Sequence, residues 1–95
     1  MQMQRQATVL HLSEAITAAS ISAADITAFQ AACHDPALTH IDLSGVTQAD
    51  SVCVCLLISA LRARQNGTPL QAVHLPDSVR ALIHLYEIDH WMLPA

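Results

Sequence analysis

The segment 52–58 constrains the fold more than any other part of the chain, because all of its residues are apolar. A run of this kind is either a buried strand or part of a buried helix. We predict a helix over residues 51–66, because the helical pattern continues through residues 61–64. Asp50 can cap its start, and Gly67 lies where a C′ glycine belongs. With no polar face at its N-terminal half, this should be the most buried helix.

Strand and helix patterns alternate along the rest of the chain. Ser22 and Asp25 form a capping-box-like helix start, and Ser44 with Gly45 indicates a turn after a strand. The expected elements are a strand at 7–12, a weaker extended piece at 15–18, a helix at 23–33, a strand at 39–43, the helix at 51–66, a strand at 70–75 and a helix capped by Asp77. This alternation predicts an α/β domain with adjacent parallel strands and right-handed crossovers.

Composition limits the function classes. The chain has 95 residues, of which 53% are apolar and only 13% are charged, so we expect one small domain with apolar surface left for a partner. Lysine is absent, which excludes a P-loop lysine and a Schiff-base lysine. A net charge of −4 without a basic run gives no reason to expect a nucleic-acid partner. The two glycines are too few for a glycine-rich phosphate loop.

Six histidines and three cysteines raise the question of a metal site. Cys53 and Cys55 would point about 200° apart on a helix, and the histidines form no HxxxH or HExxH pattern. No GxSxG nucleophile elbow is present. We therefore expect no metal, no cofactor, no catalytic residues and no enzyme activity. The odd cysteine count, and an N-terminus without an apolar region behind Arg5, predict a reduced cytoplasmic protein without a signal peptide.

The most distinctive segment spans residues 42–51. It reads DLSGV, three further residues, and then DS at the start of the long helix. A helix N-terminus carries a partial positive charge and free N–H groups, so Ser51 occupies a position that tolerates an anion or a phosphate. An ordinary N-cap at Asp50 followed by a serine accounts equally well for these residues. The local pattern therefore leaves open whether Ser51 has a functional or only a structural role.

This segment resembles the core motif of the STAS family (sulfate transporter and anti-sigma factor antagonist domains). In that family a strand ending in D-L/F-S-x-V is followed, after three residues, by D-[ST] and an apolar helix. The resemblance implies a STAS-type single domain over residues 7–95, with a mixed, mainly parallel sheet flanked by helices. Residues 1–6 would be a disordered or extended N-terminus. Residues 81–88 and 93–94 look like the end of the small STAS subunit of the Mla phospholipid transport complex.

The resemblance implies a non-catalytic subunit that binds the cytoplasmic ATPase of a phospholipid ABC transporter and stays peripheral at the inner-membrane face through it. The alternative is an anti-sigma factor antagonist, in which Ser51 matches the residue that a partner kinase phosphorylates. The family usually has glycine directly after this residue or one further on. This chain has Val52 and Cys53 there, which favours the transporter role. A nucleotide-binding module and a homodimer are further alternatives.

The expected partner-binding residues surround the start of the long helix, with Ser51 as the candidate phosphorylation residue. They are Ser44, Gly45, Gln48, Asp50, Ser51 and Val52. Leu56 and Trp91 are expected to extend the partner surface, although the tail around Trp91 could instead cover the core. We expect Tyr86 to be the last core contact of its helix. Arg62 and Arg64 are expected to form a solvated helix end.

Overall fold

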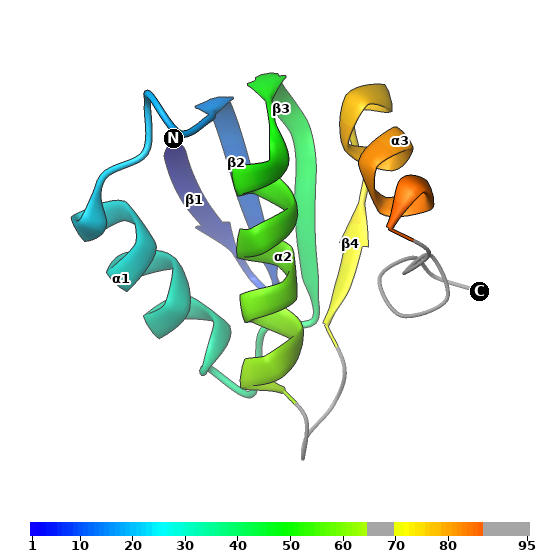
Figure 1. The fold of residues 1–95 in the computed structure, drawn as a ribbon. Helices are drawn as coiled ribbons and strands as arrows, with labels where there is room; N and C mark the ends of the chain where they lie inside the picture. Colours follow the sequence, from blue (N-terminus) through cyan, green and yellow to red (C-terminus); the bar gives the residue numbers. More distant parts are fainter. Residues whose placement is uncertain (65–69, 87–95) are drawn as a thin grey trace.

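The computed structural model describes residues 1–64 and 70–86 (Figure 1). Within them, a four-stranded sheet of order β1-β2-β3-β4 is combined with three helices. The elements are β1 (Gln2–Gln6), β2 (Val9–Ile16), α1 (Ala23–Cys33), β3 (His40–Ala49), α2 (Ser51–Ala63), β4 (Gln71–Val73) and α3 (Asp77–Leu85). β1 runs antiparallel to β2, whereas β2, β3 and β4 are parallel. The predicted α/β class with a mixed, mainly parallel sheet is confirmed.

The N-terminal strand β1 is not among the predicted strands. Its sequence, QMQRQ, has no apolar alternation that would indicate a strand. It forms because residues 7 and 8 turn the chain back, so that each residue of β1 pairs with a residue of β2. Ala7 has a φ of 53°, a left-handed conformation that glycine usually occupies in such turns. Because the residue here is alanine, the sequence gives no sign of the turn. Residues 2–6 are therefore extended, one of the two states expected for the N-terminus.

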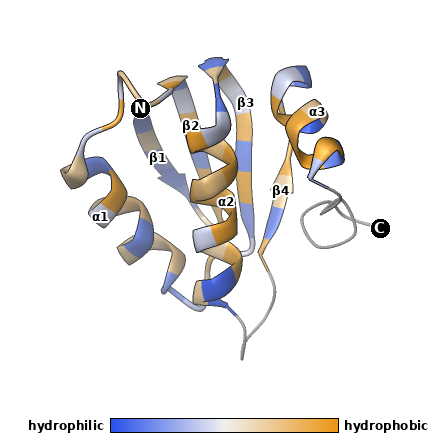
Figure 2. Ribbon diagram, in the orientation of Figure 1, coloured by the Kyte–Doolittle hydropathy of each residue, from blue (hydrophilic) through white to orange (hydrophobic). Residues whose placement is uncertain are grey.

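One face of the sheet forms the core together with the helices, and Figure 2 shows apolar residues along α2 and the strands beside it. The buried strand residues are Leu10, Leu12, Ile16, Ile41, Leu43 and Ala72. α2 packs between α1 and α3. Five residues of α2 are buried, compared with two in α1 and two in α3, which confirms α2 as the most buried helix.

β3 differs most from its predicted form. The turn expected at Ser44 and Gly45 is wrong, because β3 continues through both residues to Ala49. Its ten residues lie beside only eight residues of β2, and two register shifts absorb the difference. Such bulges let a strand bend without ending it. Of the extended piece expected at residues 15–18, only residues 15 and 16 are extended, as the end of β2, and the chain turns at residues 17 and 18.

Local hydrogen bonds set the predicted starts of the first two helices. In the capping box of α1, the Asp25 N–H donates to the Ser22 hydroxyl and the Ser22 N–H donates to the Asp25 carboxylate. α2 ends at Ala63, earlier than predicted, and the expected C′ residue Gly67 lies outside the described residues. No helix in the described part of the chain is long and apolar enough to cross a membrane.

α3 begins and ends differently from its prediction. Its N-cap residue is Pro76, whereas Asp77 is the first helical residue and makes no capping bond. Val79 and Ile83 of α3 are buried in the core. The prediction that Tyr86 is the last core contact is wrong, because this residue follows the last turn of α3 and is 49% exposed.

The side chain of Arg64 is buried, which contradicts the prediction of a solvated helix end; Arg62 is exposed as predicted. The Arg64 guanidinium donates to the carbonyl oxygens of Cys33 at 2.8 Å and Leu38 at 2.6 Å, and to that of Asp35. The first of these carbonyls belongs to the last turn of α1, where the helix dipole is negative. One side chain therefore joins the ends of α1 and α2 to the chain that leads into β3.

Replacing Arg64 by methionine is expected to lower the free energy of unfolding by about 2 to 4 kcal/mol, because three carbonyl groups each lose one donor. Urea denaturation followed by circular dichroism measures the effect. The matched control, Arg62→Met, removes an exposed guanidinium from α2 and is expected to change the free energy by less than about 0.5 kcal/mol. Equal effects of the two substitutions would contradict the anchoring role of Arg64.

Candidate functional site

The candidate site lies at the edge of the sheet where β2 and β3 end and α2 begins (Figure 1). Ala49 closes β3, Asp50 is the N-cap of α2, and Ser51 is the first residue of the helix. The carboxyl ends of parallel strands meet at one edge, where the connections gather. The connection after β2, residues 17–22, therefore lies beside the start of α2, and a hydrogen bond joins the two.

The carboxylate of Asp50 is engaged on both oxygens. Oδ1 accepts from the Val52 N–H at 2.9 Å, which confirms the predicted cap of α2. Oδ2 accepts from the Ala18 N–H at 3.1 Å, and the Asp50 N–H donates to the Ile16 carbonyl at 3.4 Å. Asp50 therefore ties the start of α2 to the end of β2 and to the loop that follows it. The local cap pattern does not reveal this long-range contact.

The loop beside Asp50 is held by Ser20. The Ser20 hydroxyl accepts from the Thr17 N–H at 3.0 Å and donates to the Ala15 carbonyl at 3.0 Å. Ala18 lies inside this turn, so its N–H is kept in place for the Asp50 carboxylate. Neither Thr17 nor Ser20 is among the predicted site residues. Their only local signal is a pair of hydroxyl side chains three positions apart, which is typical of many turns.

Ser51 is exposed at the first position of α2, and within the described residues its hydroxyl makes no hydrogen bond. Val52 is half-buried beside it, and Cys55, one turn further along the helix, is exposed. Leu56 is only 5% exposed and belongs to the core, so the expectation that it extends the partner surface is wrong. Trp91, the other residue expected there, lies outside the described residues.

Three other predicted site residues, Ser44, Gly45 and Gln48, are exposed on the second half of β3. Gly45 has a structural reason to be glycine. A Cβ atom at this position would lie 2.9 Å from the Ser13 Cβ and 3.2 Å from the Leu12 carbonyl oxygen. Glycine therefore allows β2 and β3 to approach closely where their register shifts.

Asp42, the first residue of the motif, organises a polar cluster on the face of the sheet opposite the core. Its Oδ1 lies 3.0 Å from His74 Nδ1 and accepts from the Ser44 N–H at 2.8 Å, while its Oδ2 lies 3.1 Å from His11 Nδ1. Burial raises the pKa of Asp42, but the hydrogen bonds from Ser44 and His74 together lower it by more. The pKa of Asp42 therefore lies below its ordinary value of 3.8. The cluster joins β2, β3 and the residue after β4. Its members are not among the predicted site residues except for Ser44.

The three cysteines differ in accessibility. Cys33 and Cys53 are buried, and burial raises the pKa of Cys33 to about 11 and that of Cys53 to about 12. Both thiols therefore stay protonated and unreactive at neutral pH. Cys55 is exposed on the outer side of α2, one turn beyond Ser51. The reaction rate of this thiol can therefore show whether a partner covers the start of α2.

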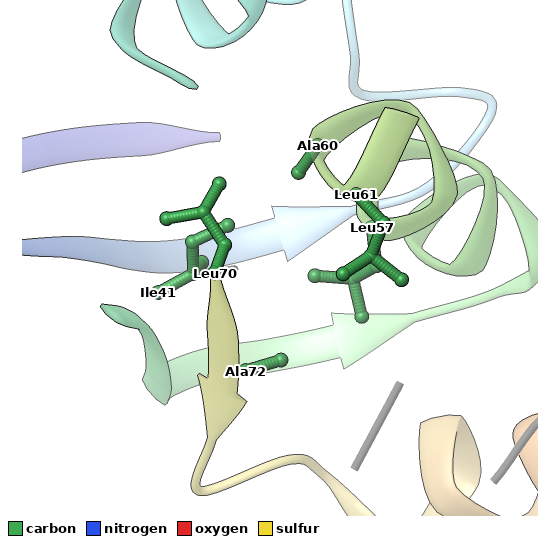
Figure 3. A pocket seen from close by; sticks show the side chains of 6 residues that line it. All are labelled: Ile41, Leu57, Ala60, Leu61, Leu70 and Ala72. Atoms are coloured by element: carbon green, nitrogen blue, oxygen red, sulfur yellow. The ribbon is translucent and has the colours of Figure 1, made fainter. Parts of the chain in front are cut away.

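The carboxylate next to Ser51 has a structural role. Each oxygen of the Asp50 carboxylate accepts a hydrogen bond from a backbone N–H group. No three His, Cys, Asp or Glu side chains in residues 1–64 and 70–86 are grouped to hold a metal ion. An apolar pocket lies away from Ser51, between α2, β3 and the chain at β4, and the described residues give its lining no polar side chain (Figure 3). Its lining residues are Ile41, Leu57, Ala60, Leu61, Leu70 and Ala72.

Gly45→Ala is expected to lower the free energy of unfolding by about 1 to 3 kcal/mol, because the added methyl group forces β2 and β3 apart. Thermal denaturation followed by circular dichroism measures the loss. Gln48→Ala changes another exposed residue in the same half of β3 and serves as the control, with an expected effect below about 0.5 kcal/mol. If Gly45→Ala were as stable as the parent, the close approach of the two strands would not constrain this position.

The ionised carboxylate of Asp42 is expected to stabilise the folded protein above about pH 4, because folding lowers its pKa. This contribution is lost as the pH falls through the folded-state pKa. Asp42→Asn should therefore be less stable than the parent at about pH 7, and the difference should shrink at about pH 3. Urea denaturation at several pH values measures the difference. A difference that did not vary with pH would show that the charge of Asp42 contributes nothing.

Two comparisons identify similar proteins. A family model described as "Mlab, STAS domain" matches residues 1–94. Comparison with curated proteins finds no match. Among solved structures, the anti-sigma factor antagonist SpoIIAA in its unphosphorylated form is similar, with a TM-score of 0.55 and 16% sequence identity over 99% of this chain and 87% of that chain. At this identity the similarity shows a shared fold.

Proposed function

The chain belongs to the STAS domain family, and on this basis we propose that it is a non-catalytic subunit that binds another protein. The proposed partner is the cytoplasmic ATPase of a phospholipid ABC transporter, which would hold the subunit at the inner-membrane face. The name Mlab in the description of the matching family model supports this Mla-like role. The observation that carries the proposal is the exposed Ser51 on a helix start that Asp50 fixes to the neighbouring loop.

The start of α2 has the properties of a preformed docking surface. Ser51 and Cys55 are exposed one turn apart, and Val52 and Ile58 are half-buried on the same helix. The surface is thus largely uncharged, with a small hydroxyl near apolar atoms. The hydrogen bonds of Asp50 hold it in place before any partner arrives. A partner that binds here therefore loses little free energy in ordering the helix start.

The end of α3 supports a protein partner independently. Leu85 is 71% exposed and Tyr86 is 49% exposed. Tyrosine combines a large apolar surface with a hydroxyl, which suits it to interfaces. Part of the high apolar content of the sequence therefore lies at the surface, in these two side chains, rather than in the core. Apolar surface of this kind favours association with another protein.

A phosphorylation-regulated anti-sigma factor antagonist is the second candidate function, with an anti-sigma factor kinase as its partner. The exposed hydroxyl of Ser51 at a helix N-terminus favours it, because such a position tolerates a phosphate. Val52 and Cys53 argue against it, since they replace the glycine usual in the family. The adjacent Asp50 carboxylate would also repel the phosphate. The similarity to SpoIIAA concerns the fold and does not decide between the two functions.

Ser51→Arg is expected to weaken binding to the candidate ATPase at least about tenfold, because a long charged side chain prevents close packing on α2. Co-expression with size-exclusion chromatography, followed by titration of the purified proteins, measures the effect. Gln71→Arg is the matched control. It adds the same side chain at an exposed position of β4 that pairs with the first residue of β3, at the end opposite the site. The proposal is wrong if the ATPase does not co-elute with the parent, or binds Ser51→Arg equally well.

The same binding experiment has a second readout at Cys55. In the free protein this exposed thiol should react with N-ethylmaleimide while the buried thiols of Cys33 and Cys53 do not. Docking of the ATPase on α2 should slow the reaction of Cys55. Incubation with a candidate anti-sigma factor kinase and ATP tests the second function. Phosphate on Ser51, absent from Ser51→Ala, would favour the antagonist.

A further inference from the structure

Strand β1 leaves one edge of the sheet open to further pairing. It lies at the end of the order β1-β2-β3-β4 and pairs with β2 (Figure 1). Four of its five residues are exposed, and Met3 is half-buried. In an antiparallel pair, alternate residues direct their N–H and C=O groups away from the partner strand. The outer side of β1 therefore presents backbone donors and acceptors that a further strand can bind.

The features that usually protect an edge strand are missing from β1. It contains no proline and no lysine, and its register with β2 is unbroken by a bulge. Its one charged side chain, Arg5, forms an ion pair of 3.1 Å with Asp35 of its own chain. The opposite edge strand, β4, has only three residues. β1 is therefore the edge of the described sheet that best accommodates another strand.

We propose that β1 pairs antiparallel with β1 of a second copy of the chain, which joins the two sheets into one. A two-fold axis through Gln4 places this residue opposite Gln4 of the second copy. Gln2 then lies opposite Gln6 of the second copy, and Met3 lies opposite Arg5. The three glutamines share one face of the strand, where their amides can hydrogen-bond to one another.

The register makes a second copy the best occupant of this edge. Every residue of the strand meets a compatible residue from the same sequence, and the single positive charge at Arg5 faces Met3 rather than another charge. A parallel, in-register pairing of the two β1 strands would instead place Arg5 opposite Arg5 of the second copy. The start of α2 follows β3, and β2 lies between β3 and β1 in the sheet. The dimer therefore leaves the start of α2 accessible and does not depend on the proposed function.

Sedimentation velocity of the full chain, from about 1 μM to about 1 mM, should show a dimer fraction that rises with concentration. Gln2→Glu combined with Gln6→Lys places opposite charges in both symmetric pairs. It should tighten dimerisation by about 2- to 30-fold. Gln2→Lys combined with Gln6→Lys places like charges in the same pairs and should weaken dimerisation by a similar factor. Both variants change exposed residues, and circular dichroism checks that the fold is retained.

Gln4 tests the position of the two-fold axis. Because this residue faces its own copy, Gln4→Glu and Gln4→Lys should both weaken the dimer, whatever the sign of the charge. Gln71→Glu, on the exposed surface of β4, is the control and should leave dimerisation unchanged. The proposal is overturned if the parent remains monomeric over the whole range. It is equally overturned if the opposite-charge and like-charge pairs have the same effect.

Discussion

The buried guanidinium of Arg64 holds together three parts of the chain that apolar packing alone would leave free to shift. It binds carbonyl oxygens at the end of α1 and before β3, and it lies directly after the last residue of α2. Hydrophobic contact is non-directional, so it fixes the orientation of an apolar helix less sharply than directed hydrogen bonds do. A guanidinium that binds fixed carbonyls removes this freedom. At the other end of α2, the Asp50 carboxylate plays the same part by binding the Ala18 N–H.

These two anchors hold α2 in the orientation that buries its apolar side. With both ends held, Val54 and Leu57 point into the core while Ser51 and Cys55 remain exposed. The candidate site is therefore a surface on a fixed helix rather than a flexible loop. This agrees with a subunit that acts by binding, because a preformed surface needs little reorganisation when a partner docks.

The sheet has two chemically different faces. The face beneath the helices is apolar, whereas the other carries the Asp42 cluster and the glutamines of β1. His11 of β2 and His74, the residue after β4, approach the two oxygens of Asp42 from opposite sides of β3, so the polar face also holds the parallel strands together. Pairing through β1 would extend both faces without covering the start of α2.

The sequence by itself determined the α/β class and the start of each helix to within one residue, and it predicts the candidate site at Ser51. The capping box of Ser22 and the cap of Asp50 join residues two or three positions apart, so a local pattern contains them. Only the tertiary structure decided that β1 is a strand, that β3 continues through Gly45 and that Arg64 is buried. The carbonyl groups of Cys33, Asp35 and Leu38, which bind Arg64, lie 26 to 31 positions away from it, and the contact of Asp50 with the loop spans 32. Such groups meet only after sheet and helices assemble, and for this reason no local pattern reveals them.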